Sequence, residues 1–219
     1  EQGKMTPELE KRIAECDNAE TLEDIYLPFK PKRRTKAQVA REQGLEPLAT
    51  LIMLGREQRP EEVAKRFVKG EVKSAADAIQ GAQYIIAETV SEDERSRHTV
   101  RRQFERDAII KSKVVKAKAD TEEAAKYKDY FDWQEPLRRC PSHRMLAMRR
   151  GEAEGILRVS ISTDDEECIE RLKRNNVRCQ GRCATLYREA VEDSYKRLLQ
   201  PSIENEFASN SKVKAEEEA

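Results

Sequence analysis

Cys140 and His143 stand three residues apart, and a thiol beside an imidazole is a pairing that nucleophilic enzymes use. Nothing nearby supplies a third group to orient the imidazole or a loop to stabilise an oxyanion. Ser142, which lies between them, is better interpreted as a helix cap. The sequence also lacks a glycine-rich phosphate-binding loop. We therefore expect no catalytic residues and a protein that is not an enzyme.

The other thiols are the remaining candidates for chemistry. Cys168, Cys179 and Cys183 could together ligate zinc, but their spacing departs from the paired knuckles of structural zinc sites. An odd total of five cysteines, no secretory signal and no apolar run of about 20 residues indicate a reducing, cytoplasmic location. We expect structural or incidental thiols, with no metal and no cofactor.

A run of cations without acids occupies twelve residues near the N-terminus. Clustered cations neutralise phosphates, and such contacts position a protein on nucleic acid without reading its sequence. Because the net charge of the chain is zero, nucleic-acid binding has to come from such a local patch. The alternative is a solvated loop whose prolines fix its path. The candidate nucleic-acid-binding residues are Lys30, Lys32, Arg33, Arg34, Lys36 and Arg41.

A second set of arginines follows Glu94, and Arg97 and Arg101 in this set share one face of a helix. Acidic residues are interleaved with them. Ion pairs within the helix are therefore the default interpretation, and packing against another part of the protein is the next.

The elements that must position these residues are mostly helical. A content of 37% hydrophobic and 38% charged residues suits amphipathic helices and not a compact α/β core. We expect a mainly α, elongated multi-helix fold with helix-turn-helix-like hairpins and at most a small β element. Two regions are expected, residues 1–92 and 93–219. Helices are expected at about 35–43, 46–55, 60–69, 74–90, 94–110, 122–132, 142–150, 166–175 and from 182, with extended segments at 112–118 and 156–163 and a kink at Pro201.

The first two of these helices form a hairpin with Gly44 at its turn. A recognition helix has to present polar side chains to the base edges of DNA. The second helix instead carries Leu48, Leu51 and Ile52, which favour burial. We expect a buried helical hairpin and no sequence-specific reading of DNA.

Residues 22–35, Leu-Glu-Asp-Ile-Tyr-Leu-Pro-Phe-Lys-Pro-Lys-Arg-Arg-Thr, closely resemble a signature of the bacterial Tex family of transcription accessory proteins. Residues 40–49 continue the resemblance. Further blocks match in order at 129–131, 141–144, 155–159 and 199–204. The resemblance covers almost the whole chain.

The resemblance implies a helical region of a longer protein. Tex-like proteins carry, after this region, an RNase H-like domain, helix-hairpin-helix motifs and an RNA-binding OB-fold, to which nucleic-acid binding is chiefly attributed. The family is also similar to an elongation factor that works with eukaryotic RNA polymerase. The expected function is a non-catalytic scaffold with weak, sequence-independent nucleic-acid contact. The alternative is a module that docks RNA polymerase or the ribosome without touching nucleic acid.

Overall fold

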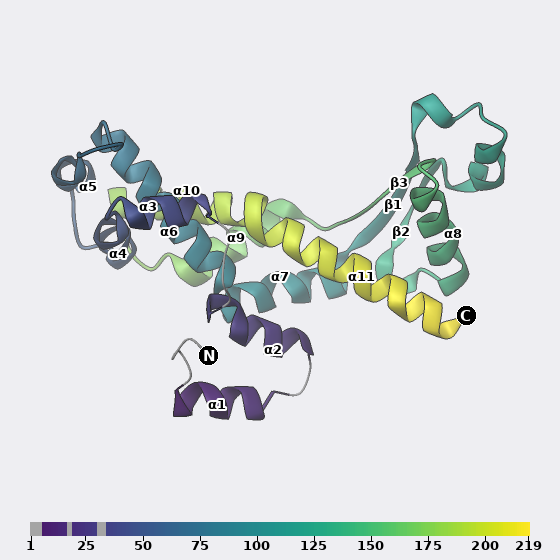
Figure 1. Ribbon diagram of the computed structural model, residues 1–219, viewed down its shortest axis with the longest axis horizontal. Coiled ribbons are helices and arrows are strands. Elements are labelled where there is room, and N and C mark those ends of the chain that lie inside the picture. The colour runs from purple at the N-terminus through teal and green to yellow at the C-terminus, as the bar shows by residue number, and fades with distance from the viewer. Residues whose placement is uncertain (1–5, 17–18, 30–33) are drawn as a thin grey trace. The chain divides into compact units, whose positions relative to one another are not determined.

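The computed structural model describes residues 6–16, 19–29 and 34–219 (Figure 1). Lys30, Lys32 and Arg33 lie outside the described residues. The chain forms two compact units: unit 1 comprises residues 1–99 and 169–199, and unit 2 comprises residues 100–168 and 200–219. The division into domains 1–92 and 93–219 stays a prediction. The packing groups residues 169–199 with the N-terminal part of the chain, which that division does not anticipate.

Helices make up the regular structure of unit 1 in its described part. It contains α1 (Pro7–Ala14), α2 (Ala19–Tyr26), η1 (Leu27–Phe29), α3 (Lys36–Glu42), α4 (Glu46–Leu54), α5 (Pro60–Ala64), η2 (Lys65–Phe67), α6 (Ala75–Glu92), the start of α7 (Glu94–Asp107), most of α9 (Asp165–Asn176), α10 (Arg182–Asp193) and the π-helix η6 (Ser194–Leu199). Side-chain caps mark where two of these helices begin. Thr6 caps α1 ahead of Pro7, and Ser74 caps α6 by accepting the amide of Asp77.

Helix α6 is the centre of unit 1. It packs against α3, α4 and α5, which precede it in the sequence, and against α10 and η6, which follow it. Ala78, Ala82, Ile86 and Ala87 are fully buried in this packing. Gly81 lies on the face toward the α3–α4 hairpin, where a Cβ atom would stand 2.3 Å from Leu45 Cδ1. The absence of a side chain at Gly81 therefore sets how closely the hairpin approaches α6.

Helices α3 and α4 form the expected hairpin. Gly44 has φ of +76°, a value that favours glycine, and makes the turn between them. Leu48, Ala49 and Ile52 of α4 are fully buried, whereas Leu54 at the end of the same helix is exposed.

Unit 2 combines a small sheet with helices. Its elements are the end of α7, β1 (Ile109–Val114), η3 (Lys116–Lys118), η4 (Glu123–Tyr130), β2 (Asp132–Pro136), η5 (Leu137–Arg139), α8 (Ser142–Ala153), β3 (Leu157–Ser162), the start of α9, and α11 (Gln200–Glu218). The strand order is β2-β1-β3, and both pairings are antiparallel. Helices α8 and α11 pack against each other and against β3.

The core of unit 2 lies on one face of this sheet. Tyr127, Ile156 and Leu157 form a buried cluster with Ala124, and Tyr130, Phe131 and Val159 pack around it. Phe104 of α7 contacts Phe207 of α11 with ring centroids 5.4 Å apart. The apolar side chains of the strands thus meet those of the helices on the covered face of the sheet.

Strand β2 and its surroundings correct several sequence predictions. The segment 122–132 forms the 3₁₀ helix η4 and not an α-helix, and the next residues form an unpredicted strand. The first extended segment spans 109–114 and not 112–118. Ser142 is not the cap of α8, because Pro141 occupies that position and the Ser142 hydroxyl hydrogen-bonds Glu218. Asp164 caps α9 by accepting the amide of Glu167 at 3.1 Å.

The irregularity expected at Pro201 takes the form of η6, which ends two residues before that proline. Proline cannot donate the backbone hydrogen bond that a continuous helix requires, so a change of helical register there is physically reasonable. Helix dominates the residues described, as expected for a mainly α fold with a small β element. Within the same residues, no helix is both long and apolar enough to cross a membrane.

We predict that Gly81→Ala destabilises unit 1 although alanine favours helix. The new methyl group would overlap the fully buried Leu45 side chain, and such overpacking costs about 1–3 kcal/mol. The free energy of unfolding, measured by urea denaturation, should fall by that amount. In a Leu45→Ala background the same substitution should cost much less, because the overlapping atoms are gone. Equal costs in both backgrounds would show that Gly81 does not set the approach of the hairpin.

Candidate nucleic-acid interface

Thr35 fixes the start of α3 against α6. Its hydroxyl oxygen accepts the amide of Gln38 at 3.0 Å, which caps α3, and its hydroxyl donates to Glu88 Oε2 at 2.8 Å. Glu88 is almost fully buried on α6. The backbone around Thr35, within the basic run, is therefore held in place by α6.

Arg41 belongs to this support. Its Nη1 donates to Glu88 Oε1 at 2.8 Å, and its Nε lies 3.4 Å from Glu46. Only 25% of the Arg41 side chain is exposed. Its charge is already matched by a buried carboxylate, so Arg41 holds α3 on α6.

Arg34 has a different environment. Its side chain is 69% exposed and its Nη2 lies 3.0 Å from Glu42 Oε2, which is itself half exposed. Ion pairs of this kind contribute about 0–1 kcal/mol, so the guanidinium can exchange this partner for a phosphate at little cost.

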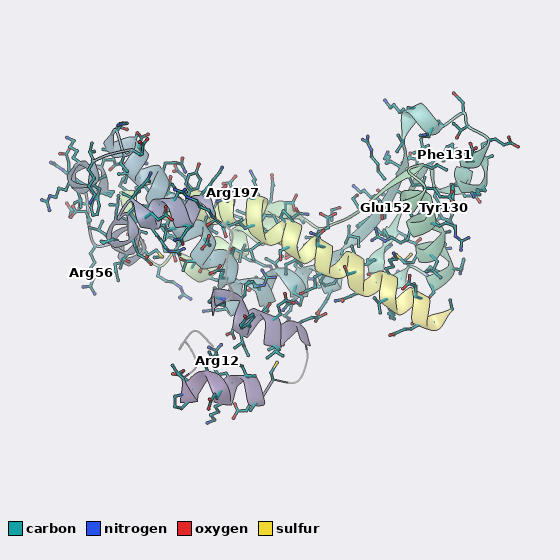
Figure 2. All side chains as sticks on the ribbon, in the orientation of Figure 1. Arg12, Arg56, Tyr130, Phe131, Glu152 and Arg197 are labelled. Atoms are coloured by element: carbon teal, nitrogen blue, oxygen red, sulfur yellow. The ribbon has the colours of Figure 1, made fainter. Side chains whose placement is uncertain are left out.

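Lys36 is exposed and extends over an aromatic ring that the sequence analysis did not single out. Its Nζ lies 5.0 Å from the centroid of Tyr84, and the guanidinium of Arg197 lies 5.4 Å from the same centroid. Arg197, which is labelled in Figure 2, is on η6. It also pairs with Asp193 at 2.8 Å. Single-turn π-helices often occur at functional sites. The break expected at Pro201 is the one sequence feature near Arg197, and it carries no indication of the contact with Tyr84.

Arg97 and Arg101 on α7 bind carboxylates of other helices. Arg97 Nε donates to Asp24 of α2 at 2.9 Å, and Arg101 binds Glu206 of α11 through two bonds of 2.7 and 3.0 Å. Both arginines are buried. These pairs agree with the second interpretation, packing against another part of the protein, because the partners are distant in the sequence.

A comparison with known families decides which group of proteins this chain resembles. A family described as Tex central region-like matches residues 55–219. The chain belongs to the Tex family.

Individual relatives agree with the Tex assignment. Protein YdcI of Bacillus subtilis is 37% identical over 223 residues, covering 100% of this chain and 31% of the relative. The transcriptional accessory protein Tex of Neisseria gonorrhoeae is 41% identical over 76% of this chain and 22% of its own length. A more distant relative, S1 RNA-binding domain-containing protein 1 of Pongo abelii, is 28% identical over 100% of this chain and 23% of its own length. The chain thus spans less than a third of these Tex-related proteins.

The geometry around Cys140 does not favour a nucleophile in this Tex-family chain. Burial is the main reason that the pKa of the Cys140 thiol is raised to about 11, and the negative charge of Glu135 contributes to the same rise. The thiol faces the carbonyl oxygen of Pro141 at 3.7 Å, and among the described residues no hydrogen bond joins it to His143. A thiol of such high pKa is protonated near neutral pH and is a poor nucleophile.

The remaining thiols are also engaged in packing. The Cys183 thiol donates to the carbonyl oxygen of Glu57 at 3.1 Å, and Cys168 is fully buried. Within the residues described, no three His, Cys, Asp or Glu side chains are grouped so that they could hold a metal ion.

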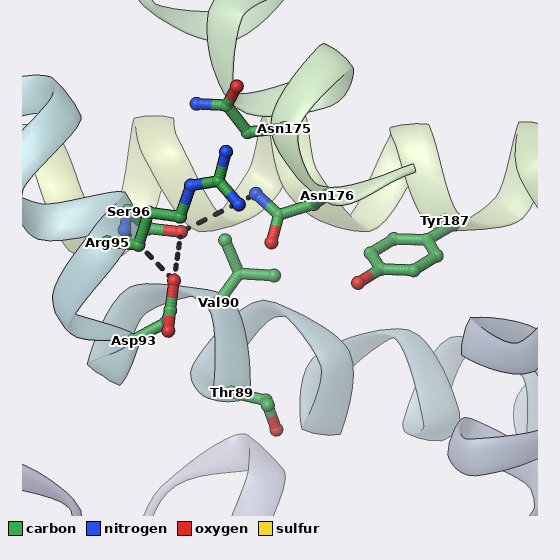
Figure 3. A pocket seen from close by; sticks show the side chains of 8 residues that line it. All are labelled: Thr89, Val90, Asp93, Arg95, Ser96, Asn175, Asn176 and Tyr187. Atoms are coloured by element: carbon green, nitrogen blue, oxygen red, sulfur yellow. Dashed lines mark hydrogen bonds between the residues drawn. The ribbon is translucent and has the colours of Figure 1, made fainter. Parts of the chain in front are cut away.

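A pocket of about 280 Å³ lies in unit 1 at the junction of α6, α7, α9 and α10 (Figure 3). Asp93 accepts two bonds from Ser96 at 3.0 Å, and Asn176 donates to Leu172 at 2.8 Å. Burial raises the pKa of Tyr187, so its phenol stays neutral. Asp93, Ser96 and Asn176 bond to one another, whereas Thr89 and Asn175 bond to Ile85 and Thr99, which do not line the pocket.

We predict that Glu88→Gln destabilises the protein by about 2 kcal/mol. The substitution removes the charge that matches Arg41 in a buried position and turns an amide donor toward its guanidinium. The free energy of unfolding is measured by denaturant titration. Glu42→Gln is the matched control, because it removes the exposed partner of Arg34 and should cost less than about 0.5 kcal/mol. Equal effects of the two substitutions would contradict the internal role of Glu88.

We predict that alkylation of Cys140 keeps accelerating with pH well beyond the range of a free cysteine. A free thiol plateaus above a pKa of about 8.5. The raised pKa of Cys140, about 11, keeps the thiolate scarce, so its rate should rise about tenfold per pH unit from pH 8 to 10. Rates with iodoacetamide are measured by mass spectrometry of the Cys140 peptide. A plateau below pH 9 would show that the thiol is not shifted.

Proposed function

We propose that this chain is a non-catalytic helical scaffold within a Tex-family transcription accessory protein and that it contacts nucleic acid weakly through the start of α3. We further propose a cytoplasmic location, where its cysteine thiols remain reduced. Two groups of observations support the nucleic-acid contact: the placement of the described cations, and the names of the relatives.

The exposed cations at the start of α3 are the observation that carries the proposal. Arg34 and Lys36 flank Thr35, which is bonded to the buried Glu88. Their charges stay in solvent while their backbone is held by α6, so little conformational freedom is lost when phosphates bind. The residues immediately before them, Lys30, Lys32 and Arg33, extend the same run in the sequence.

Arg197 and Tyr84 enlarge the surface. Lys36 and Arg197 approach one tyrosine ring, which orders both cationic side chains. Arg197 is also paired with Asp193, so Lys36 is the cation at this ring that phosphates can most readily reach. Phosphate contacts of this kind position a protein but do not read bases. The proposed binding is therefore independent of sequence and sensitive to salt.

The names of the relatives agree with partners of this class. One relative is called a transcriptional accessory protein and another an S1 RNA-binding domain-containing protein. The rival proposal, from the same names, is a module that docks the transcription machinery or ribosome without touching nucleic acid. Salt dependence distinguishes the two proposals. If the chain contacts phosphates, the logarithm of its affinity for nucleic acid falls linearly with the logarithm of the salt concentration. If it is only a protein-docking module, it does not bind nucleic acid.

We predict that Arg34→Glu combined with Lys36→Glu weakens binding of the 219-residue chain to a generic duplex. The slope of log affinity against log salt should become shallower by about 2, at about 0.9 for each phosphate that the variant no longer neutralises. Fluorescence anisotropy of a labelled duplex of random sequence, titrated at several salt concentrations, measures both quantities. Thermal stability should be nearly unchanged, because both side chains are exposed.

Arg56→Glu combined with Arg59→Glu is the matched control for this prediction. Both arginines are exposed in unit 1, and the change in net charge is identical. An equal loss of affinity in the two double variants would mean that overall charge, and not the surface at α3, controls binding. Unchanged binding by the α3 variant would reject this surface, and no binding by the wild type would favour the docking module.

A further inference from the structure

The three-stranded sheet of unit 2 has one covered face and one open face. On the covered face, Ile110, Leu157 and Ile161 are buried. Side chains alternate along each strand, so the intervening residues point the other way and are mostly exposed. The open face of the sheet is defined by Lys111, Lys113, Asp132, Gln134, Arg158 and Ser160.

Two cations stand directly opposite each other on this open face. Lys113 of β1 is paired in register with Arg158 of β3. Like charges at directly opposite positions destabilise an antiparallel sheet, since their Cβ atoms are about 4.5–5.5 Å apart. A merely solvated sheet face would gain stability from an acid at either position. The repulsion therefore indicates that the positive charge is kept for something outside the sheet.

The acids of the open face do not neutralise it. Lys111 faces Ser160 on one side and Gln134 on the other. Lys113 pairs with Asp132 at 2.8 Å, but both side chains are largely exposed, so the pair is weak.

Beyond β1, Lys116 and Lys118 of η3 continue the positive charge, and both are exposed. Among the described residues no carboxylate pairs with either of them, nor with Lys111 or Arg158. The cations of the open face and of η3 thus exceed the acids available to match them.

We propose that the open face of the sheet is a second nucleic-acid contact surface, which binds the phosphate backbone of a duplex through Lys111, Lys113 and Arg158, with Lys116 and Lys118 at its margin. This inference rests on the proposed function for the class of partner, but it uses residues of a different unit. The positive surface matches the regular array of phosphates along a duplex.

The side chains of the open face distinguish a duplex from a single strand. Sheets that bind single-stranded RNA stack its bases on exposed aromatic side chains. The defined open face carries no aromatic residue. Trp133 alternates to the covered side, where Arg144 stacks on its ring at 5.5 Å. The surface therefore offers phosphate contacts and no base stacking.

The test uses the 219-residue chain and a labelled duplex of random sequence, with a single strand of the same length for comparison. For Lys111→Glu combined with Arg158→Glu, we expect the salt slope to become shallower by about 2 and the affinity at 0.1 M salt to fall on the order of 50-fold, as when two phosphates are no longer neutralised. The wild type should bind the duplex at least as tightly as the single strand.

Thermal unfolding gives a second readout, in which the melting temperature and the affinity are expected to change in opposite directions. Arg158→Glu replaces a like-charge pair with an opposite-charge pair, so the melting temperature should equal or exceed that of the wild type while binding weakens. A structural role for Arg158 would instead lower the melting temperature. Lys111→Arg combined with Arg158→Lys should keep both stability and affinity.

The matched control is Arg102→Glu combined with Lys212→Glu, which makes the same change of charge on exposed helical positions of unit 2. Equal losses of affinity in the control and the sheet variant would overturn the proposal, as would tighter binding of the single strand or binding unaffected by the sheet variant. If only the α3 variant weakens binding, the sheet surface fails and the proposed function stands. If only the sheet variant weakens it, the sheet surface stands and the α3 surface fails.

Discussion

The burial of α6 on nearly every side is the constraint on which the architecture of unit 1 depends. A helix whose buried residues lie on most of its circumference has to be enclosed by several other elements. Residues before it supply α3, α4 and α5, and residues after the sheet supply α10 and η6. The two segments of unit 1, which are far apart in the sequence, are therefore parts of one core.

The polar residues of α6 then fix the register of the elements around it, since buried polar groups require partners. Gln83 donates to the carbonyl of Leu186 at 3.0 Å and to Glu189 at 2.9 Å, both on α10. Glu88 receives Thr35 and Arg41 from α3. The same bonds that complete the core thus hold the start of α3, and with it the exposed Arg34 and Lys36, in one place.

Local signals made much of this fold predictable, and long-range partners account for what was not. The apolar stripe of α6 and its Ser74 cap lie within one helix, so the sequence specified that helix almost to its ends. Strand β2 was missed because its inward positions include the polar Glu135, and its pairing with β1 is visible only in the folded chain. The arginines of the basic run looked equivalent, but Arg41 meets a carboxylate 47 residues away while Arg34 stays exposed. Composition cannot separate such residues, because burial of the partner decides their roles.

The division of unit 1 into two sequence segments has a consequence for synthesis on the ribosome. Its second segment begins at residue 169 and ends at 199, so α6 emerges long before α10 and η6 exist to cover it. At about 5–20 residues per second, the hundred or so residues between them take roughly 5–20 s to make. During that interval the nascent chain displays the uncovered side of α6, while the whole sheet of unit 2 is synthesised. A chaperone that shields apolar helices would find its substrate in that interval.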